Sequence, residues 1–154
     1  MRLVRICGCL LFLLVVACKK DEVDIRTPEE SLTSSMAARW NFVKVDRVLH
    51  DQNGDVVDDG TWGGTTAGVP GDYMAFTADG KMEYLITNMY PEGQAYVGHG
   101  TYNIISENEF DMNVDGFGIS HCRVDTLEGN KFIFTDRFFQ GNGRYAVSKY
   151  YLSK

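Results

Sequence analysis

Apolar and polar residues alternate with a period of two along most of the chain after residue 39. In segment 131–139, for example, Phe132 and Phe134 fall on one face, and Ile133 and Thr135 fall on the other. This period is typical of half-buried strands, and the runs are separated by turn residues such as Asp79-Gly80. The pattern predicts eight strands, near residues 39–49, 72–77, 81–88, 96–105, 109–114, 118–127, 131–139 and 144–152.

Two segments break this alternation. Thr27-Pro28-Glu29-Glu30 predicts a helix start, because Thr27 suits the N-cap, Pro28 suits the first helical position, and Glu30 completes a capping box. We expect this helix to end near Ala38. Residues 50–71 contain six glycines and predict one long loop.

Evenly spaced strands joined by tight turns indicate an all-β protein, either an up-and-down barrel or a sandwich. The alternation defines an inner face made of Trp40, Phe42, Tyr102, Ile104, Phe110, Met112, Val114, Cys122, Val124, Phe132, Phe134, Tyr150 and Leu152. The interior of an eight-stranded barrel holds side chains or one small ligand. So many large inward residues predict that little empty volume is left.

The first 17 residues have the pattern of a signal peptide. Arg2 and Arg5 precede an apolar run at 6–17, which is shorter than the stretch of about 20 residues that a transmembrane helix needs. We therefore divide the chain into a signal peptide at 1–17, a flexible tether at 18–27 and a single domain at 28–154.

Val15-Val16-Ala17-Cys18 resembles the lipobox of bacterial lipoproteins, in which the cysteine carries diacylglycerol and becomes the mature N-terminus. The alternative is an ordinary secretory signal that is cut nearby. Lys20, Asp21 and Glu22 resemble the surface-export signal of Bacteroidota lipoproteins, although a solvated linker would have the same composition. The resemblance implies an outer-membrane lipoprotein, held to the membrane by its lipid and exposed on the cell surface. A domain that faces the periplasm is the alternative.

Charge and cysteine content narrow the possible partners. The net charge is −6, and loss of Arg2 and Arg5 with the signal makes the mature chain more acidic, which argues against binding nucleic acid. Cys7 and Cys9 leave with the signal and Cys18 carries lipid. Only Cys122 then remains, so we expect no disulfide within the mature chain.

Several short motifs together resemble the lipocalin-like lipoproteins of Bacteroidota, and the resemblance covers roughly residues 32–154. The motifs are Ala38-Arg39-Trp40, Phe76-Thr77-Ala78-Asp79-Gly80-Lys81, Tyr102-Asn103-Ile104 and Tyr150-Tyr151-Leu152-Ser153-Lys154. Ala38 stands where lipocalins usually carry a glycine. The resemblance implies an eight-stranded antiparallel up-and-down barrel with a short N-terminal helix, and it implies no activity.

Candidate catalytic and metal-binding residues do not form a known motif. His50, His99 and His121 lack metal-ligand spacing, and we expect no carboxylate beside His99 or His121. Ser120 and His121 are neighbours on a strand, so they point to opposite faces and cannot act as a nucleophile and base. We predict no catalytic residue, no metal and no cofactor.

The segment Asp51-x-Asn53-x-Asp55 has oxygen ligands at alternate positions, as calcium loops do. An EF-hand loop that begins at Asp51 would need Gly where Val56 stands and Glu where Trp62 stands. The segment therefore favours an Asx turn over a calcium site.

These observations predict a lipid-anchored binding module for a small apolar or glycan-like ligand. The candidate ligand-binding residues are Trp62, Tyr84, Tyr102, Phe132, Phe134 and Tyr150. Trp62 would stack on the ligand at the barrel mouth, or it would tuck into the barrel end and anchor its loop. Two alternatives stay open: an interaction subunit of an outer-membrane assembly with a filled barrel, and an enzyme acting on carbohydrate or lipid.

Overall fold

The structure is a computed structural model, and it describes residues 27–58, 63–88, 94–140 and 143–154. Cys18, Lys20, Asp21 and Glu22 lie outside the described residues, and so does Trp62. The lipidation, export and loop-stacking predictions that rest on these five residues therefore stay predictions.

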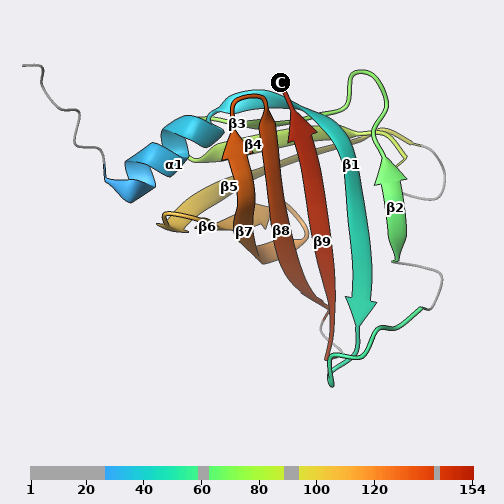
Figure 1. Cartoon of the computed structure of the whole chain (residues 1–154). Coiled ribbons are helices and arrows are strands. Elements are labelled where there is room, and N and C mark those ends of the chain that lie inside the picture. The colour runs from blue at the N-terminus through green and yellow to red at the C-terminus, as the bar shows by residue number, and fades with distance from the viewer. Residues whose placement is uncertain (1–26, 59–62, 89–93, 141–142) are drawn as a thin grey trace, which may run out of the picture.

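Eight antiparallel strands form a closed barrel (Figure 1). In order around the barrel they are β1 (Ala38–His50), β3 (Tyr73–Phe76), β4 (Lys81–Ile86), β5 (Tyr96–Ser106), β6 (Glu109–Val114), β7 (Gly118–Glu128), β8 (Lys131–Gln140) and β9 (Arg144–Ser153). Pairing of β1 with β9, from Asn41↔Ser153 to His50↔Tyr145, closes the ring. The predicted up-and-down barrel of eight antiparallel strands is confirmed.

The prediction of one long loop at 50–71 was wrong for part of this segment, because residues 64–67 form a ninth strand, β2 (Gly64–Ala67). β2 and β3 pair with the same edge of β1, through Lys44↔Ala67 and Trp40↔Met74. Four residues with no large apolar side chain give no alternation, so this strand is held by backbone pairing that the sequence pattern does not reveal. At the junction Gly68 lies against β1, and a Cβ there would be 2.1 Å from the carbonyl oxygen of Phe42.

A bulge in β1 changes which residues face the barrel interior. The register with β9 shifts between Phe42 and Lys44, so Trp40 and Phe42 are buried before the shift and Val45 and Leu49 after it. Inward positions therefore pass from even to odd numbers within one strand. Arg47 falls on the inward face as a result.

The N-terminal helix α1 (Pro28–Met36) begins with the predicted capping box. The Thr27 hydroxyl accepts a hydrogen bond from the Glu30 amide at 3.2 Å, and the Thr27 amide donates to the Glu30 carboxylate at 2.9 Å. The helix ends at Met36, before the predicted Ala38, because Ala38 already belongs to β1. No helix in the described part of the chain is both long enough and apolar enough to cross a membrane.

The helix covers one end of the barrel, which we call the closed end (Figure 1). Leu32 and Met36 are buried in the barrel core, and the Trp40 indole N–H donates to the Met36 carbonyl at 2.8 Å. The other end, where β1 finishes and β9 begins, we call the mouth.

Aromatic side chains fill the half of the barrel nearer the closed end. The Phe76 ring has four edge-on aromatic neighbours, with ring centroids 5.5 to 6.5 Å away: Tyr102, Phe110, Phe132 and Phe134. Phe110, Phe132 and Phe134 are fully buried. The expectation of a filled interior is thus met in this half, whereas the other half contains a cavity near the mouth.

Candidate functional site

A cavity of about 100 Å³ lies inside the barrel near the mouth, and we call it the mouth cavity. Its apolar walls are Met112, Val114, Phe117, Phe138 and Ala146. Its polar lining consists of Arg47, Tyr84, Ser120, Asp136, Ser148 and Tyr150. An apolar cavity of about 150 Å³ holds a benzene molecule, so this cavity fits a small ligand or one end of a larger one.

Three of the polar residues form a row across adjacent strands, which we call the polar floor. Ser148 on β9 pairs with Arg47 on β1 on one side and with Asp136 on β8 on the other. Directly opposed residues of this kind have Cβ atoms about 5 Å apart on the same face of the sheet. The polar floor therefore places a positive and a negative side chain inside the barrel, with a hydroxyl between them.

The neighbouring rows of paired residues show how deep the polar floor lies in the barrel. Toward the closed end, Tyr150 pairs with Val45 and Phe134, and these residues belong to the packed core. Toward the mouth, Ala146 pairs with Leu49 and Phe138. A ligand that enters from the mouth meets apolar walls first and charged groups at the bottom.

Asp136 is held by its neighbours on β9. Only 5% of its surface is exposed, and its carboxylate accepts hydrogen bonds from the Ser148 amide at 3.2 Å and the Tyr150 hydroxyl at 3.5 Å. Burial raises the pKa of Asp136 to about 6, against the opposing effects of the Ser148 hydrogen bonds and the Arg47 charge. Its protonation therefore changes within the range of mildly acidic pH.

Tyr150 supports Asp136 from the side of the packed core. Its ring stacks on Phe134 with centroids 4.7 Å apart and an interplanar angle of 10°. Burial raises the pKa of Tyr150 far above its ordinary value, so the hydroxyl stays protonated and able to donate.

Arg47 differs from Asp136, because nothing in the described part of the chain is hydrogen-bonded or ion-paired to its side chain. It acts on Asp136 only through its charge. A guanidinium has five N–H donors in a planar fork, and donors that no protein group occupies are open to a ligand. Arg47 is thus the polar group of the cavity that is best placed to take a ligand.

The predicted ligand-binding residues divide between two places in the barrel. Tyr84 and Tyr150 line the mouth cavity. Tyr102, Phe132 and Phe134 lie in the packed core and do not line it. The sequence pattern places Tyr102, Phe132, Phe134 and Tyr150 on the inner face but gives no information on their depth along the barrel axis.

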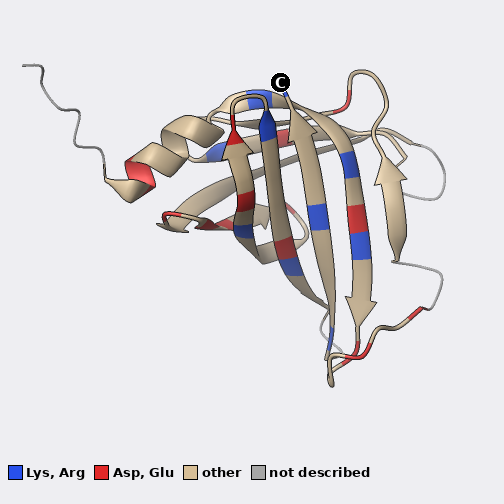
Figure 2. Cartoon of the chain, viewed as in Figure 1, with Lys and Arg blue, Asp and Glu red and all other residues tan. Residues whose placement is uncertain are grey.

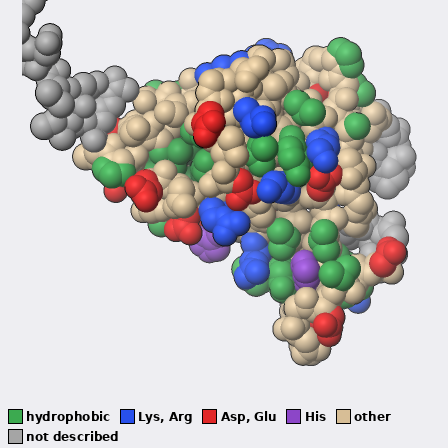
Figure 3. Space-filling view, viewed as in Figure 1, with side chains coloured by type: hydrophobic (Ala, Val, Ile, Leu, Met, Phe, Trp, Pro, Cys, Tyr) green, Lys and Arg blue, Asp and Glu red, His purple; other side chains and the backbone are tan. Residues whose placement is uncertain are grey.

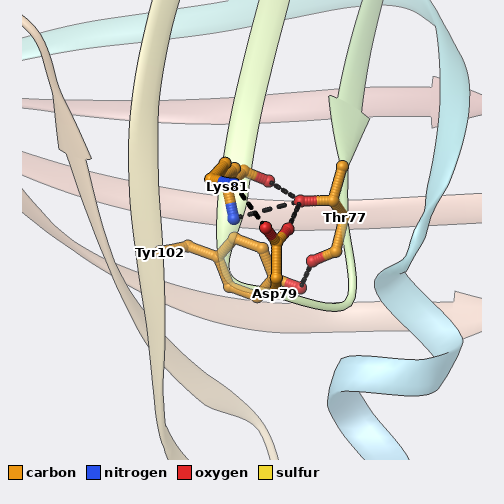
Figure 4. A network of polar contacts seen from close by, with 4 residues as sticks. All are labelled: Thr77, Asp79, Lys81 and Tyr102. Atoms are coloured by element: carbon orange, nitrogen blue, oxygen red, sulfur yellow. Dashed lines mark hydrogen bonds and ion pairs between the residues drawn. The ribbon is translucent and has the colours of Figure 1, made fainter.

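Tyr102 is fixed by the hairpin between β3 and β4 (Figure 4). Its hydroxyl donates to the Thr77 carbonyl at 2.7 Å. Within the turn, the Asp79 carboxylate accepts from the Thr77 hydroxyl and pairs with the Lys81 ammonium, each at 2.5 Å. The hydroxyl of Tyr102 is therefore part of a structural network.

Sequence reasoning missed Arg47, Ser120, Asp136 and Ser148 as site residues. The sequence could have indicated Asp136, because it lies two residues after Phe134 and so falls on the same inward face of the strand as Phe132 and Phe134. No such signal existed for Arg47, since the bulge in β1 alone turns it inward.

The outer face of the barrel carries a histidine–carboxylate pair that contradicts one expectation. His121 Nδ1 lies 2.5 Å from the carboxylate of Asp111 on the neighbouring strand, although no carboxylate was expected there. Ser120 is buried and His121 is exposed, so these neighbours do point to opposite faces as predicted. Within the described ranges, no three His, Cys, Asp or Glu side chains are grouped closely enough to hold a metal ion.

The predicted Asx turn at Asp51 is confirmed. One oxygen of the Asp51 carboxylate accepts from the amides of Asn53 and Asp55, at 2.8 and 2.9 Å. These backbone hydrogen bonds lower the pKa of Asp51. The Asp51 carboxylate therefore stabilises the turn itself.

A second surface feature lies on the outside of the barrel near the mouth, and we call it the aromatic patch. His50 stacks on Tyr145 with centroids 4.9 Å apart, Arg137 lies 4.5 Å from the same ring, and Phe139 is 59% exposed. Figure 3 shows apolar side chains gathered on the lower part of this face, and Figure 2 shows charges of both signs along the strands above it. On the face drawn in Figure 3, the patch therefore lies next to a region of mixed charge.

No protein-family model matches the sequence, and no curated protein matches it. Among solved structures, a mutant of bovine odorant-binding protein aligns over 78% of this chain and 74% of its own, with 10% identity and a TM-score of 0.49. The bovine lipocalin allergen Bos d 2 aligns over 79% and 74%, with 10% identity and a TM-score of 0.47. Aphrodisin, a sex pheromone from female hamster, aligns over 77% and 74%, with 10% identity and a TM-score of 0.44. These likenesses concern the fold alone.

Proposed function

We propose that this protein is a lipid-anchored, extracytoplasmic binding module whose mouth cavity takes a small amphipathic ligand. The observation that supports the proposal best is the make-up of this cavity, which joins apolar walls to a polar floor. Binding sites for small molecules combine largely apolar linings with a few placed polar groups in this way. We assign no catalytic role to these residues.

The packing of the barrel limits the size of the ligand. The closed-end half is filled by aromatic side chains, so a long ligand cannot run the length of the barrel. Phe117 lines the cavity and is 38% exposed, which lets a bound molecule extend past it into solvent. The ligand is therefore short, or it is held by one end only.

The anchor belongs to the same proposal and rests on the sequence around Cys18. Two or more acyl chains on that cysteine would hold the domain firmly, because each buried CH₂ contributes about 0.8 kcal/mol. The tether joins the domain at α1, on the closed end. Lys20, Asp21 and Glu22 favour the cell surface as the location, with the periplasmic side as the alternative.

Filling the cavity tests the binding role. Val114→Phe would place a larger side chain in the cavity wall, whereas Val97→Phe would place the same side chain at a position that is 54% exposed. The mature chain from residue 18, with Cys18→Ser to prevent lipidation, would be titrated with hexan-1-ol while the methyl signals are followed by NMR.

We expect saturable shifts at Met112 in the cavity wall and none at Met36 in the closed end. Val114→Phe should weaken binding by about tenfold or more, and Val97→Phe should not. Shifts confined to outer-surface residues, or equal binding by both variants, would show that the mouth cavity is not the binding site.

The aromatic patch favours a second candidate function, that of an interaction subunit in an outer-membrane assembly. Exposed groups of large aromatic residues often mark protein contact sites. A photo-crosslinking residue at Phe139, compared with one at Val97, would distinguish the two roles in intact cells. A defined cross-linked partner from position 139 alone would favour the interaction subunit.

A further inference from the structure

We propose that the mouth cavity recognises a carboxylate, and that Arg47 is the residue that binds it. This inference rests on the proposed binding function and names the chemical class of the ligand. The ligand would be a small organic acid with its carboxylate on the polar floor and a short apolar body between Val114, Phe117 and Phe138.

The first argument is the unmet hydrogen-bonding capacity of Arg47. Its side chain lines the cavity and is partly buried, and no described residue bonds to it. A planar guanidinium matches the two oxygens of a carboxylate, and such paired, charge-assisted bonds are among the strongest in proteins. A carboxylate at this position would satisfy donors that the protein leaves without a partner.

The second argument is that the Asp136 carboxylate does not bind the Arg47 guanidinium. Its carboxylate is bonded to Ser148 and Tyr150, and it influences Arg47 only across space. The negative group of the floor is thus already satisfied, whereas the positive group is not. The site should therefore prefer an anion to a cation, although both charges line the same cavity.

The third argument is the order of polar and apolar residues from the bottom of the cavity to the mouth. The polar floor lies at the inner side, and the row Leu49, Ala146 and Phe138 lies nearer the mouth. A ligand with a charged head and an apolar body therefore fits with its head inward. This arrangement removes the apolar body from water while the head keeps its hydrogen bonds.

Three probes of equal length separate the alternatives: hexanoate, hexan-1-ol and hexylamine. Each would be titrated at pH 7 into the mature chain carrying Cys18→Ser, with binding measured by calorimetry and by the methyl shift of Met112. We expect hexanoate to bind about tenfold or more tightly than hexan-1-ol, and hexylamine to bind most weakly.

Substitutions on β1 assign the preference to one residue. Arg47→Gln should weaken hexanoate binding by about tenfold and hexan-1-ol binding by much less, and Arg47→Lys should keep part of the preference. Lys44→Gln is the matched control, because Lys44 lies on the outer side of the same strand and pairs with Asp46 at 2.7 Å. This control should bind hexanoate like the unmodified chain.

The outcomes separate this inference from the function on which it rests. Equal or tighter binding of hexan-1-ol or hexylamine would overturn the carboxylate assignment and leave the binding function standing. Unchanged hexanoate binding by Arg47→Gln would also overturn it. If none of the three probes binds at millimolar concentration, both the inference and the proposed function fail.

Discussion

Arg47 and Asp136 face the same cavity from strands that are not neighbours, with Ser148 of β9 between them. The Asp136 carboxylate is bonded to the Ser148 amide and to the Tyr150 hydroxyl, whereas no described residue is hydrogen-bonded or ion-paired to the Arg47 side chain. The barrel thus carries opposite charges that attract each other without forming an ion pair. This relationship has consequences for stability and for binding.

Asp136 should make stability depend on pH. Its pKa is about 6 in the folded chain against an ordinary value of 3.8, so the folded state binds more protons between these values. Stability should therefore fall as the pH rises from about 4 to about 6, by up to about 3 kcal/mol. Asp136→Asn should remove this slope, as measured by urea unfolding at pH 4 and pH 7.

Asp46→Asn is the control for that experiment. Hydrogen bonds from Lys44 and Thr65 lower the pKa of Asp46. Asp46 therefore stabilises the fold when the pH is above its ordinary pKa, and this stabilisation is lost on acidification. The loss of unfolding free energy caused by Asp46→Asn should therefore increase as the pH rises. For Asp136→Asn the loss should instead decrease as the pH rises. Equal slopes for Asp136→Asn and the unmodified chain would contradict the burial of an ionisable Asp136.

Phe134→Ala should destabilise the protein by about 3–5 kcal/mol, because Phe134 is fully buried and its removal leaves a cavity in the packed core. Phe139→Ala on the same strand removes a ring that is 59% exposed and should cost less than about 1 kcal/mol. Denaturant unfolding measures both. Similar losses for the two variants would mean that the inner face of β8 is wrongly assigned.

Gly68→Ala should destabilise the edge of β1 by about 1–3 kcal/mol. An added Cβ would lie 2.1 Å from the Phe42 carbonyl oxygen, and the Gly68 amide donates to the Val43 carbonyl at 2.8 Å. Gly63→Ala is the matched control, since a Cβ there meets nothing within 4 Å. Unfolding and exchange of the residue 68 amide, which donates to Val43, should distinguish the variants, and equal stability would contradict the close approach of residue 68 to β1.

Cys18→Ala should release the protein from membranes, because it removes the proposed attachment point of the lipid. Fractionation of cells followed by alkaline washing of the membranes would measure this. Cys122→Ala is the control, because Cys122 is buried in the barrel and should not affect membrane association. A Cys18→Ala protein that stays on washed membranes would refute the anchor.

The sequence predicted the inner face well wherever the alternation was unbroken. Phe132 and Phe134 were placed on the inner face, and the same series extends to Asp136. The alternation failed at Arg47, because one extra residue in β1 reverses the inward side and no sequence signal marks the bulge. β2 was missed because its residues pair through their backbones and bury little apolar surface.

Depth along the barrel axis could not be predicted at all. Tyr84 and Tyr102 both face inward, yet Tyr84 lines the cavity and Tyr102 is fixed to the β3–β4 hairpin. Depth depends on how each strand is staggered against its neighbours, and this stagger is a property of the closed barrel. The position of the candidate site therefore depends on the combined registers of β1, β8 and β9.

The most direct measurement of the central claim is the position of bound hexanoate, read from intermolecular nuclear Overhauser effects. The account predicts contacts from the hexanoate chain to the Met112 methyl group and the Phe117 ring, and it predicts that Arg47→Gln needs about tenfold more hexanoate to give the same contacts. Contacts confined to outer residues such as Val97 or Phe139, or contacts that form at the same hexanoate concentration in Arg47→Gln as in the unmodified chain, would contradict it.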